Sequence, residues 1–127
     1  MRPPNGNPPS APRTPVRDPQ QLAPALVARQ RAGDAEGMAL LYEPDAVLNG
    51  AQGPVAIGRD AICTFYRGLI AAGRRFELGQ QRPALVSADL ALTSTRLPNG
   101  AVTAEVARRQ RDGTWLWVID NPAMGKG

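Results

Sequence analysis

Two carboxylate residues in the C-terminal half of the chain, Glu105 and Asp120, are spaced so that they could share one site. They lie in two strand-like segments joined by the tight-turn sequence Arg111-Asp112-Gly113. If Asp112-Gly113 is a two-residue hairpin loop, Glu105 stands opposite Asp120, and opposed side chains have Cβ atoms roughly 4.5–5.5 Å apart. Two close carboxyl groups in a partly apolar site do not both ionise easily, so the pKa of one rises. We therefore predict that Asp120 and Glu105 form a catalytic acid–base pair.

A second tight turn, Pro98-Asn99-Gly100, brings further side chains to this pair. A two-residue loop at Asn99-Gly100 places Ser94 opposite Glu105, with Arg96 nearby on the same face. An arginine there would oppose the rise in pKa and could orient both carboxyl groups. We predict substrate contacts for Ser94, Arg96 and Val118 on this face, which reads Leu90, Leu92, Ser94, Arg96, Thr103, Glu105, Ala107, Leu116, Val118 and Asp120.

The same register has an alternative interpretation. The opposite face is the more apolar one and reads Thr93, Thr95, Leu97, Val102, Ala104, Val106, Trp115, Trp117 and Ile119. On periodicity alone this second face would pack against the helices, and Glu105 and Asp120 would lie in solvent beside Arg96 and Arg109. A β-bulge would shift the register by one residue and reverse the assignment of faces.

The composition excludes several kinds of site. The chain has no histidine and one cysteine, Cys63. A Ser-His-Asp triad, a histidine-ligated metal and an internal disulfide are therefore impossible. We expect no metal and no cofactor, and we expect Cys63 to be a small buried hydrophobic residue because no histidine can activate it.

The 127 residues carry 15 Lys and Arg against 11 Asp and Glu, a net charge of +4, and the pI is about 10.2. Half of this excess lies in residues 1–18, which are rich in proline and poor in apolar residues, and which we predict to be a disordered tail. Such a tail is either an inert leader or a protein-recognition arm. The rest of the chain is nearly balanced, so no nucleic-acid partner is expected. No apolar run approaches the roughly 20 residues that span a membrane, and no secretory signal is recognisable, so we expect no membrane association and a cytoplasmic location.

The elements that would position the pair follow from hydrophobic periodicity and from the turn residues. The patterns predict helices from Gln20 to Ala32, from Ala35 to Tyr42 and from Asp60 to Gly73. Strands are expected at residues 46–48, 55–57, 76–80, 84–97, 101–110 and 114–120. Helices first and an antiparallel meander last indicate an α+β fold, with the helices packed on one face of a sheet.

Three strings, in this order, resemble one known family: ARQRAGDAEGMALLYEPDAVLNG, IGRDAICTFYRGL and RRQRDGTWLWVIDNP. They are similar to the nuclear transport factor 2-like superfamily, in its SnoaL-like polyketide cyclase and ketosteroid isomerase-like branch. The resemblance covers residues 19–124. It implies a cone-shaped fold in which three N-terminal helices pack on a strongly curved antiparallel sheet around a pocket. It also implies a homodimer through the sheet face, with Glu105 inside the cone and the tryptophan face covered by the partner.

The functional residues of this branch transfer only in part. Where ketosteroid isomerases have an oxyanion-hole tyrosine, this chain has Leu26, and in place of their aspartate base it has Asn49. Glu105 matches their carboxylic acid on the penultimate strand, and in SnoaL-like cyclases a late-strand aspartate, here Asp120, serves as the base. Steroid isomerisation is therefore not expected, because an amide is not basic enough to abstract a proton. Asn49 either orients a ligand carbonyl or is a turn residue at the end of a strand.

Three functions remain open from the sequence. The first is a cofactor-independent isomerase, cyclase or hydrolase acting on an apolar carbonyl or epoxide substrate, with Leu26, Tyr42, Phe65 and Leu92 lining its pocket. The second is a non-catalytic module that binds a small apolar molecule, with its carboxylates salt-bridged to Arg96. The third is a protein-interaction domain that uses the Trp115 and Trp117 face together with the proline-rich tail.

Overall fold

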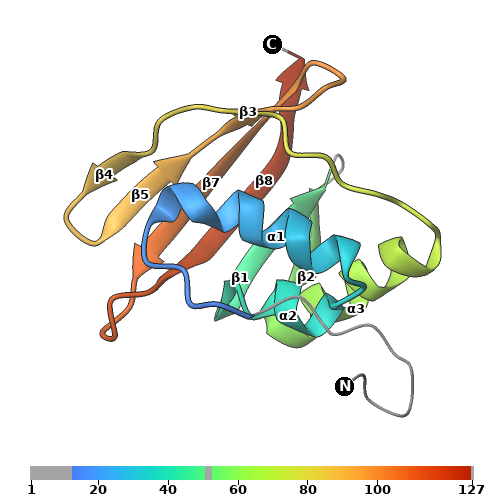
Figure 1. Cartoon of the computed structure of the whole chain (residues 1–127), viewed down its shortest axis with the longest axis horizontal. Coiled ribbons are helices and arrows are strands. Elements are labelled where there is room, and N and C mark those ends of the chain that lie inside the picture. The colour runs from blue at the N-terminus through green and yellow to red at the C-terminus, as the bar shows by residue number, and fades with distance from the viewer. Residues whose placement is uncertain (1–12, 51–52, 127) are drawn as a thin grey trace, which may run out of the picture.

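A computed structural model describes residues 13–50 and 53–126, so most of the predicted tail lies outside the described residues. The elements in chain order are η1 (Pro19–Gln21), α1 (Leu22–Arg31), α2 (Ala35–Ala39), β1 (Tyr42–Gly50), β2 (Gly53–Ile57), α3 (Arg59–Ala71), β3 (Gln80–Gln81), β4 (Leu85–Ser87), β5 (Leu90–Thr93), β6 (Thr95–Arg96), β7 (Ala101–Arg109) and β8 (Trp115–Lys126). The predicted α+β class is confirmed: the helices lie across one face of a curved sheet (Figure 1).

The sheet has eight strands, and its main path runs β2-β1-β8-β7-β5-β4, with β6 pairing β7 and β3 pairing β6. All pairs are antiparallel except β1 with β8, which run parallel. The prediction of a wholly antiparallel sheet is therefore wrong at this one pair. The parallel pair puts the first strand of the chain beside the last, in the middle of the sheet.

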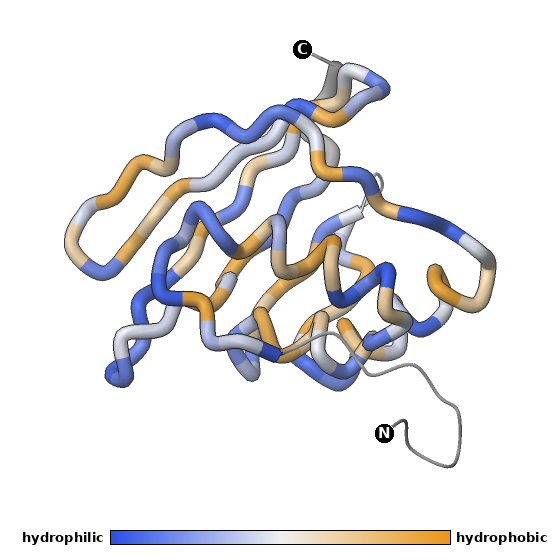
Figure 2. Tube along the Cα trace, viewed as in Figure 1, coloured by the Kyte–Doolittle hydropathy of each residue, from blue (hydrophilic) through white to orange (hydrophobic). Residues whose placement is uncertain are grey.

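The core lies between the helices and the inner face of the sheet. Its largest fully buried side chains are Trp117, Tyr42, Leu22, Met38, Leu41, Leu48 and Ile62. Hydrophobic residues recur along α1, α3 and the strands behind them (Figure 2). Burying a large apolar side chain contributes roughly 1.5–3 kcal/mol, so this layer holds the helices on the sheet.

The string Ala-Gly-Asp-x-x-Gly forms the junction between α1 and α2. Gly33 ends α1 with a φ of 71°, a conformation that favours glycine. Asp34 is the N-cap of α2, and its Oδ1 accepts a hydrogen bond from the backbone N–H of Gly37 at 3.0 Å. A Cβ at position 37 would lie 2.0 Å from Asp34 Oδ2, so the second glycine leaves room for the capping carboxylate.

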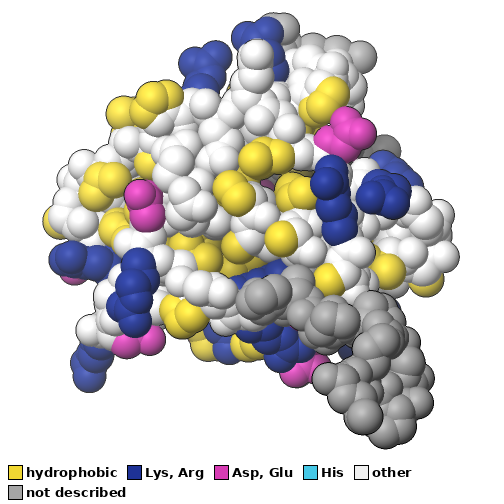
Figure 3. Space-filling model, viewed as in Figure 1, with side chains coloured by type: hydrophobic (Ala, Val, Ile, Leu, Met, Phe, Trp, Pro, Cys, Tyr) yellow, Lys and Arg dark blue, Asp and Glu magenta, His cyan; other side chains and the backbone are white. Residues whose placement is uncertain are grey.

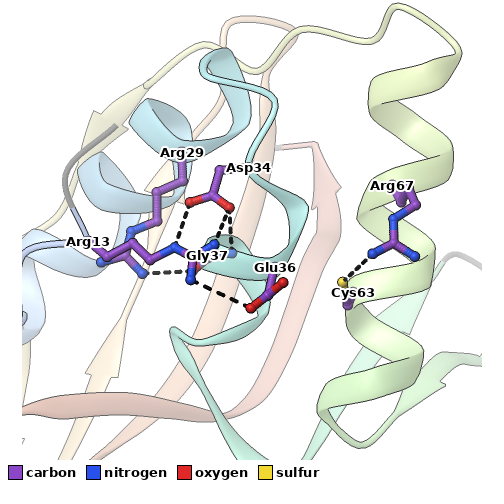
Figure 4. A network of polar contacts seen from close by, with 7 residues as sticks. All are labelled: Arg13, Arg29, Asp34, Glu36, Gly37, Cys63 and Arg67. Carbon is purple, nitrogen blue, oxygen red and sulfur yellow. Dashed lines mark hydrogen bonds and ion pairs between the residues drawn. The ribbon is translucent and has the colours of Figure 1, made fainter. Parts of the chain in front are cut away.

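The segment before η1 packs against the domain, although the sequence assigned residues 13–18 to a disordered tail. Arg13 forms a two-pronged ion pair with Asp34, from Nε to Oδ2 at 2.9 Å and from Nη2 to Oδ1 at 2.7 Å (Figure 4). The buried Arg29 donates from Nη2 to Thr14 O at 3.1 Å. Val16 is buried, and its carbonyl accepts from the Trp115 N–H at 2.8 Å. The packed part of the chain therefore begins before the predicted boundary at residue 19.

Three predicted elements differ from the observed ones, and the expected strand at residues 76–80 is reduced to β3, which covers Gln80–Gln81. The second helix ends at Ala39 rather than at Tyr42, and Tyr42 begins β1, so Pro44 lies in a strand instead of terminating a helix. The predicted strand at residues 84–97 is divided into β4, β5 and β6, because a turn at Ala88, with a φ of 53°, folds β4 back onto β5. Within the described ranges, the helices are all too short or too polar to cross a membrane.

Replacing Asp34 with alanine should lower the free energy of unfolding by about 2 kcal/mol, because it removes both the cap of α2 and the partner of Arg13. Arg13 holds the pKa of Asp34 below its usual value, so this stabilisation is present above the ordinary aspartate pKa and is lost as the pH falls below it. Urea denaturation at pH 7 and pH 3 measures both effects. The control is Glu36→Ala, since Glu36 is exposed and lies 3.6 Å from Arg13, and should change stability by less than about 0.5 kcal/mol. Equal losses in the two variants would contradict the role of Asp34.

Candidate active site

A three-residue loop determines the register in which β5 and β6 pair with β7. Leu97 N–H donates to Ala101 O at 2.7 Å, so the loop consists of Pro98, Asn99 and Gly100, and Gly100 has a φ of 88°. Such loops place a glycine in the left-handed region at their third position. The sequence predicted a two-residue loop, and the extra residue shifts the register by one. Thr93, not Ser94, therefore stands opposite Glu105.

The β7–β8 hairpin contains a second three-residue loop, and a β-bulge cancels its effect. Gln110 N–H donates to Thr114 O at 2.7 Å, and Gly113 has a φ of 85°. Ala107 pairs with Trp117 but Val106 pairs with Ile119, so Val118 is an extra residue in β8. Beyond the bulge Glu105 pairs with Asp120, which is the opposition that the sequence predicted.

The bulge places both the tryptophans and the carboxyl residues of this hairpin in the interior. Trp115 and Trp117 are buried before it, and Asp120, 4% exposed, is buried after it. Glu105 is 6% exposed. Neither predicted face is therefore right as a whole, since the carboxyl pair and the tryptophans share the side of the sheet that the helices cover.

Asp120 is held by a chain of two tyrosines. Tyr42 Oη donates to Asp120 Oδ2 at 2.5 Å, and the hydroxyls of Tyr42 and Tyr66 lie 2.6 Å apart. Because the Tyr42 proton goes to the carboxylate, its oxygen accepts the proton of Tyr66. Tyr42 comes from the start of β1, Tyr66 from α3 and Asp120 from β8, so three elements converge on one carboxyl group.

Burial decides how these groups titrate. It raises the pKa of Asp120 to about 7, the neighbouring charge of Glu105 adds to the rise, and the hydrogen bond from Tyr42 opposes it. Burial also raises the pKa of Glu105, against the hydroxyls of Thr103 and Thr93. The pKa values of Tyr42 and Tyr66 lie well above the ordinary tyrosine value, mainly through burial, so both hydroxyls keep their protons. Near neutral pH the carboxyl pair therefore holds at least one proton for part of the time.

Glu105 is oriented by side chains of the neighbouring strands. Thr93 Oγ1 donates to Glu105 Oε1 at 2.6 Å and accepts from the indole N–H of Trp117 at 3.3 Å. The hydroxyl of Thr103 is a second hydrogen-bond partner of this carboxyl group. The two threonines and the indole hold the carboxyl group in one orientation.

The position of Tyr42 depends on backbone contacts. Arg59, the first residue of α3, donates to Tyr42 O from Nε at 3.1 Å and from Nη2 at 2.6 Å. Trp117 N–H donates to Leu41 O at 2.8 Å, and the rings of Tyr42 and Trp117 have centroids 5.3 Å apart. These contacts join the start of β1 to α3 and β8, so the hydroxyl is directed at Asp120 by the packing of three elements.

The arrangement is suited to proton transfer. A carboxylate with a pKa near 7 is a stronger base than an ordinary aspartate and is still ionised in about half of the molecules at neutral pH. The adjacent Glu105, when protonated, can donate a hydrogen bond to an oxygen that gains negative charge.

Comparison with known proteins places this geometry in a family. A family model described as a SnoaL-like domain matches residues 24–121. The chain belongs to the SnoaL-like domain family. The expected nuclear transport factor 2-like fold is confirmed as well, since solved neighbours carry that name. A search of curated proteins found no match.

Three solved structures show the likeness of this SnoaL-like domain at the level of fold. An NTF2-like protein with a cystatin-like fold from Novosphingobium aromaticivorans is 22% identical, with a TM-score of 0.63 over 85% of this chain and 80% of that one. A ketosteroid isomerase-like protein from Erwinia carotovora atroseptica is 20% identical, with a TM-score of 0.60 over 80% and 88%. A putative calcium/calmodulin-dependent protein kinase type II association domain from Thiobacillus denitrificans is 20% identical, with a TM-score of 0.67 over 87% and 99%.

The other predicted site residues of the SnoaL-like domain are divided between the interior and the outside. Leu26 and Phe65 are half-buried against the core, and the Phe65 ring lies 5.4 Å from that of Tyr66. Ser94 instead donates to the Thr103 carbonyl at 2.7 Å, and Arg96 is exposed, without a carboxylate partner among the described residues. Both predictions assumed the wrong hairpin register.

Two further predicted contacts lie at the edge of the site. Asn49 donates to Asn121 Oδ1 at 3.4 Å, next to an irregularity in the pairing of β1 with β2, which fits a residue at the end of a strand. Val118 is the extra residue of the bulge and is half-buried, and its predicted substrate contact stays a prediction.

The sequence-based prediction missed Thr93 and the hydroxyl of Tyr66 as polar members of the site, and it placed Thr103 on the face of Glu105 without giving it a role. The glycine at the third position of Pro98-Asn99-Gly100 was the signal that could have placed Thr93. Tyr66 was interpreted only as core or pocket wall. In the portion of the chain that the structure describes, no three acidic or cysteine residues gather in a way that could hold a metal ion.

Asp120 should make this SnoaL-like domain less stable as the pH rises. Its folded pKa of about 7 lies above the ordinary value of 3.8, so the folded state binds more protons between these values and loses stability across that interval. At about 1.4 kcal/mol for each pKa unit, the loss approaches about 4 kcal/mol. Urea unfolding of Asp120→Asn at pH 5 and pH 8 should show a much smaller loss than the unsubstituted protein. The exposed Asp45→Asn is the control, and a pH dependence that Asp120→Asn leaves unchanged would contradict the assignment.

Proposed function

We propose that this protein binds a small apolar carbonyl compound and catalyses a proton transfer on it without a cofactor, with Asp120 as the base. The proposal rests on one observation: a buried carboxyl with a pKa of about 7, hydrogen-bonded by Tyr42. Strongly shifted pKa values in a shielded site are typical of catalytic acids and bases. The SnoaL-like fold includes isomerases and cyclases, and such reactions can begin with this step.

In the proposed step, the Asp120 carboxylate takes a proton from a carbon next to the carbonyl of the substrate. The electrons of the broken C–H bond form the carbon–carbon double bond of an enolate, and the charge moves to the carbonyl oxygen. Neutral Glu105 donates a hydrogen bond from its carboxyl O–H to that oxygen. Where a double bond is conjugated with the enolate, return of the proton from Asp120 to the far carbon gives an isomer. Attack of the enolate carbon on a second carbonyl of the same molecule closes a ring, and the alkoxide formed takes the proton that Asp120 holds.

A binding module without turnover is the second candidate, and the tyrosine chain favours it. The Tyr42 hydroxyl donates to Asp120 and accepts from Tyr66, so no donor of Tyr42 remains for a ligand. The version in which Arg96 neutralises the carboxylates has no support in this geometry, because Arg96 is exposed. A protein-interaction domain could not use Trp115 and Trp117 as its contact surface, because both are buried inside the chain.

The partners that we propose are a small apolar molecule and a second copy of the chain. Exposed apolar side chains gather on the outer face of the sheet, where a groove of about 300 Å³ is lined by Leu85, Val86, Ser87, Leu90, Ala91, Leu92 and Val106. Leu85 is 68% exposed, which is unfavourable for an isolated chain. Leu92, which the sequence placed in the pocket, is 45% exposed on this outer face, so that expectation was wrong. A homodimer through this part of the sheet would cover them, in place of the tryptophan face that the sequence suggested. A cytoplasmic location stays a prediction.

Deuterium exchange tests the catalytic proposal without knowledge of the natural substrate. In D2O the protein should accelerate deuterium incorporation beside the carbonyl of an apolar ketone such as 2-tetralone, with a rate that rises as Asp120 ionises around pH 7. Asp120→Asn should lower this rate by at least about 100-fold, because an amide is not a general base. Mass spectrometry of the ketone measures the rate.

Asp45→Asn serves as the control for this experiment, since Asp45 is an exposed aspartate on β1. It should exchange at the unsubstituted rate. Bound ketone with no accelerated exchange in the unsubstituted protein would support the binding module instead. Exchange that survives Asp120→Asn would eliminate Asp120 as the base.

The dimer can be tested separately. Leu92→Glu places a charge in the outer groove and should raise the dimer dissociation constant at least about tenfold, because a buried unpaired charge is costly at an interface. Light scattering across a dilution series measures this change. Leu78→Glu, at an exposed leucine outside the groove, should leave the dissociation constant unchanged. A monomer at all concentrations in the unsubstituted protein would rule out this homodimer.

A further inference from the structure

A long connection of little regular structure joins α3 to β4 and contains only the short strand β3. Figure 1 shows it passing beside α1, on the side of the sheet where the helices lie. Gln30 of α1 attaches its first part, donating from Nε2 to Arg74 O at 2.5 Å and accepting at Oε1 from Phe76 N–H at 2.9 Å. One buried glutamine thus acts as a latch on this segment.

A second glutamine attaches the last part of the connection. Gln20 donates from Nε2 to Arg82 O at 2.9 Å and accepts at Oε1 from Ala84 N–H at 2.8 Å. Its own carbonyl accepts from Gln81 Nε2 at 2.7 Å. Side-chain amides therefore hold both ends, and a segment fixed by a few such bonds opens at lower free energy than a strand inside the sheet.

The connection leads directly to the carboxyl site. The Phe76 ring packs edge-on against Tyr66, with centroids 6.0 Å apart. Tyr66 is hydrogen-bonded to Tyr42, which donates to Asp120. Because Tyr42, Tyr66 and Asp120 are buried, a ligand can reach them only if a covering segment moves, and moving Phe76 would uncover Tyr66 first.

The outer surface of the connection is positively charged. Arg74, Arg75 and Arg82 lie on it, and Arg31 and Arg96 flank it through contacts with Phe76 O and Gln80. These five arginines have no carboxylate partner among the described residues, and Glu77 is the one acidic residue between positions 72 and 84. In Figure 3, Lys and Arg side chains stand along this side of the visible face. Unpaired arginines at the rim of a buried site attract anions.

We infer that ligands enter beneath the Phe76 connection, and that the preferred ligand is an apolar molecule with an anionic end. The apolar body passes under Phe76 towards Tyr66, and the anionic end stays outside with the arginines of the connection. The inference names the substrate class of the proposed catalytic site and rests on that proposal for the use of the bound molecule. Because the anionic end stays outside, the ligand's charge is also kept away from Asp120 and Glu105, which would repel it.

Two matched probes test this inference: octanoate, and 1-octanol, which has the same chain without the charge. Calorimetry at low salt should show octanoate binding about tenfold more tightly, with the advantage reduced in high salt. Arg74→Glu and Arg75→Glu, made singly, should each reduce the preference for octanoate by about threefold. Arg111→Glu is the matched control, because it reverses the same charge at an exposed position on the β7–β8 turn and should leave the preference unchanged.

The latch is tested by kinetics. Gln30→Ala should raise the association rates of both probes severalfold, measured by stopped-flow tryptophan fluorescence, without altering the preference between them. If Gln30→Ala does not fold, Phe76→Ala tests the same entrance. NMR should show a shift of the Trp117 indole resonance, assigned with Trp115→Phe, because Trp117 packs on Tyr42.

Three results would overturn the inference: equal affinity for the two probes, an effect of Arg111→Glu as large as that of Arg75→Glu, or binding that leaves the Trp117 resonance unmoved. The inference and the catalytic proposal can fail separately. A preference for octanoate that depends on Arg74 and Arg75, in a protein that exchanges no deuterium into 2-tetralone, would support the entrance and ligand class while contradicting catalysis by Asp120.

Discussion

The interaction on which the site depends is the hydrogen bond from Tyr42 to a carboxyl group that has been removed from water. Burial makes ionisation of Asp120 unfavourable, and one neutral donor offsets only part of this cost. The opposing effects bring its pKa to about 7. A full ion pair in the same place would have produced an inert carboxylate. The balance between burial and a single hydroxyl donor therefore makes the group able to exchange a proton near neutral pH.

The bulge at Val118 makes this balance possible in a strand that also supplies core. Strand side chains alternate between faces, so a regular β8 that buries Trp115 and Trp117 would direct Asp120 to the outer face. One extra residue changes the alternation after Trp117. The strand can then pack its indoles under the helices and still direct Asp120 towards Tyr42. Bulges are frequent beside active sites because they redirect a side chain in this way.

The sequence was sufficient for the α+β class, for the helix junction at Asp34 and for the Glu105–Asp120 opposition, because capping residues and turn glycines act locally. The opposition was obtained although the loop length and the bulge were both missed, since their register shifts cancel. Between β5 and β7 no bulge compensates for the extra loop residue. Thr93 was therefore missed, and Ser94 and Arg96 were assigned to the interior. Tyr42 was assigned to a helix because its place depends on contacts with Arg59 and Trp117, which are distant in the sequence.

Arg29 and Asp120 are both buried, but their environments differ. Arg29 donates to Gly37 O and Thr14 O and lies near Asp34, so its burial joins α1, α2 and the segment before η1 (Figure 4). Asp120 has no cation among the groups that shift its pKa, and its nearest charge is a second carboxyl. An arrangement that only stabilised the fold would not keep two mutually repelling acids in its interior. The proposed proton transfer would account for the stability that this pair costs, because it needs a proton to be held there and released.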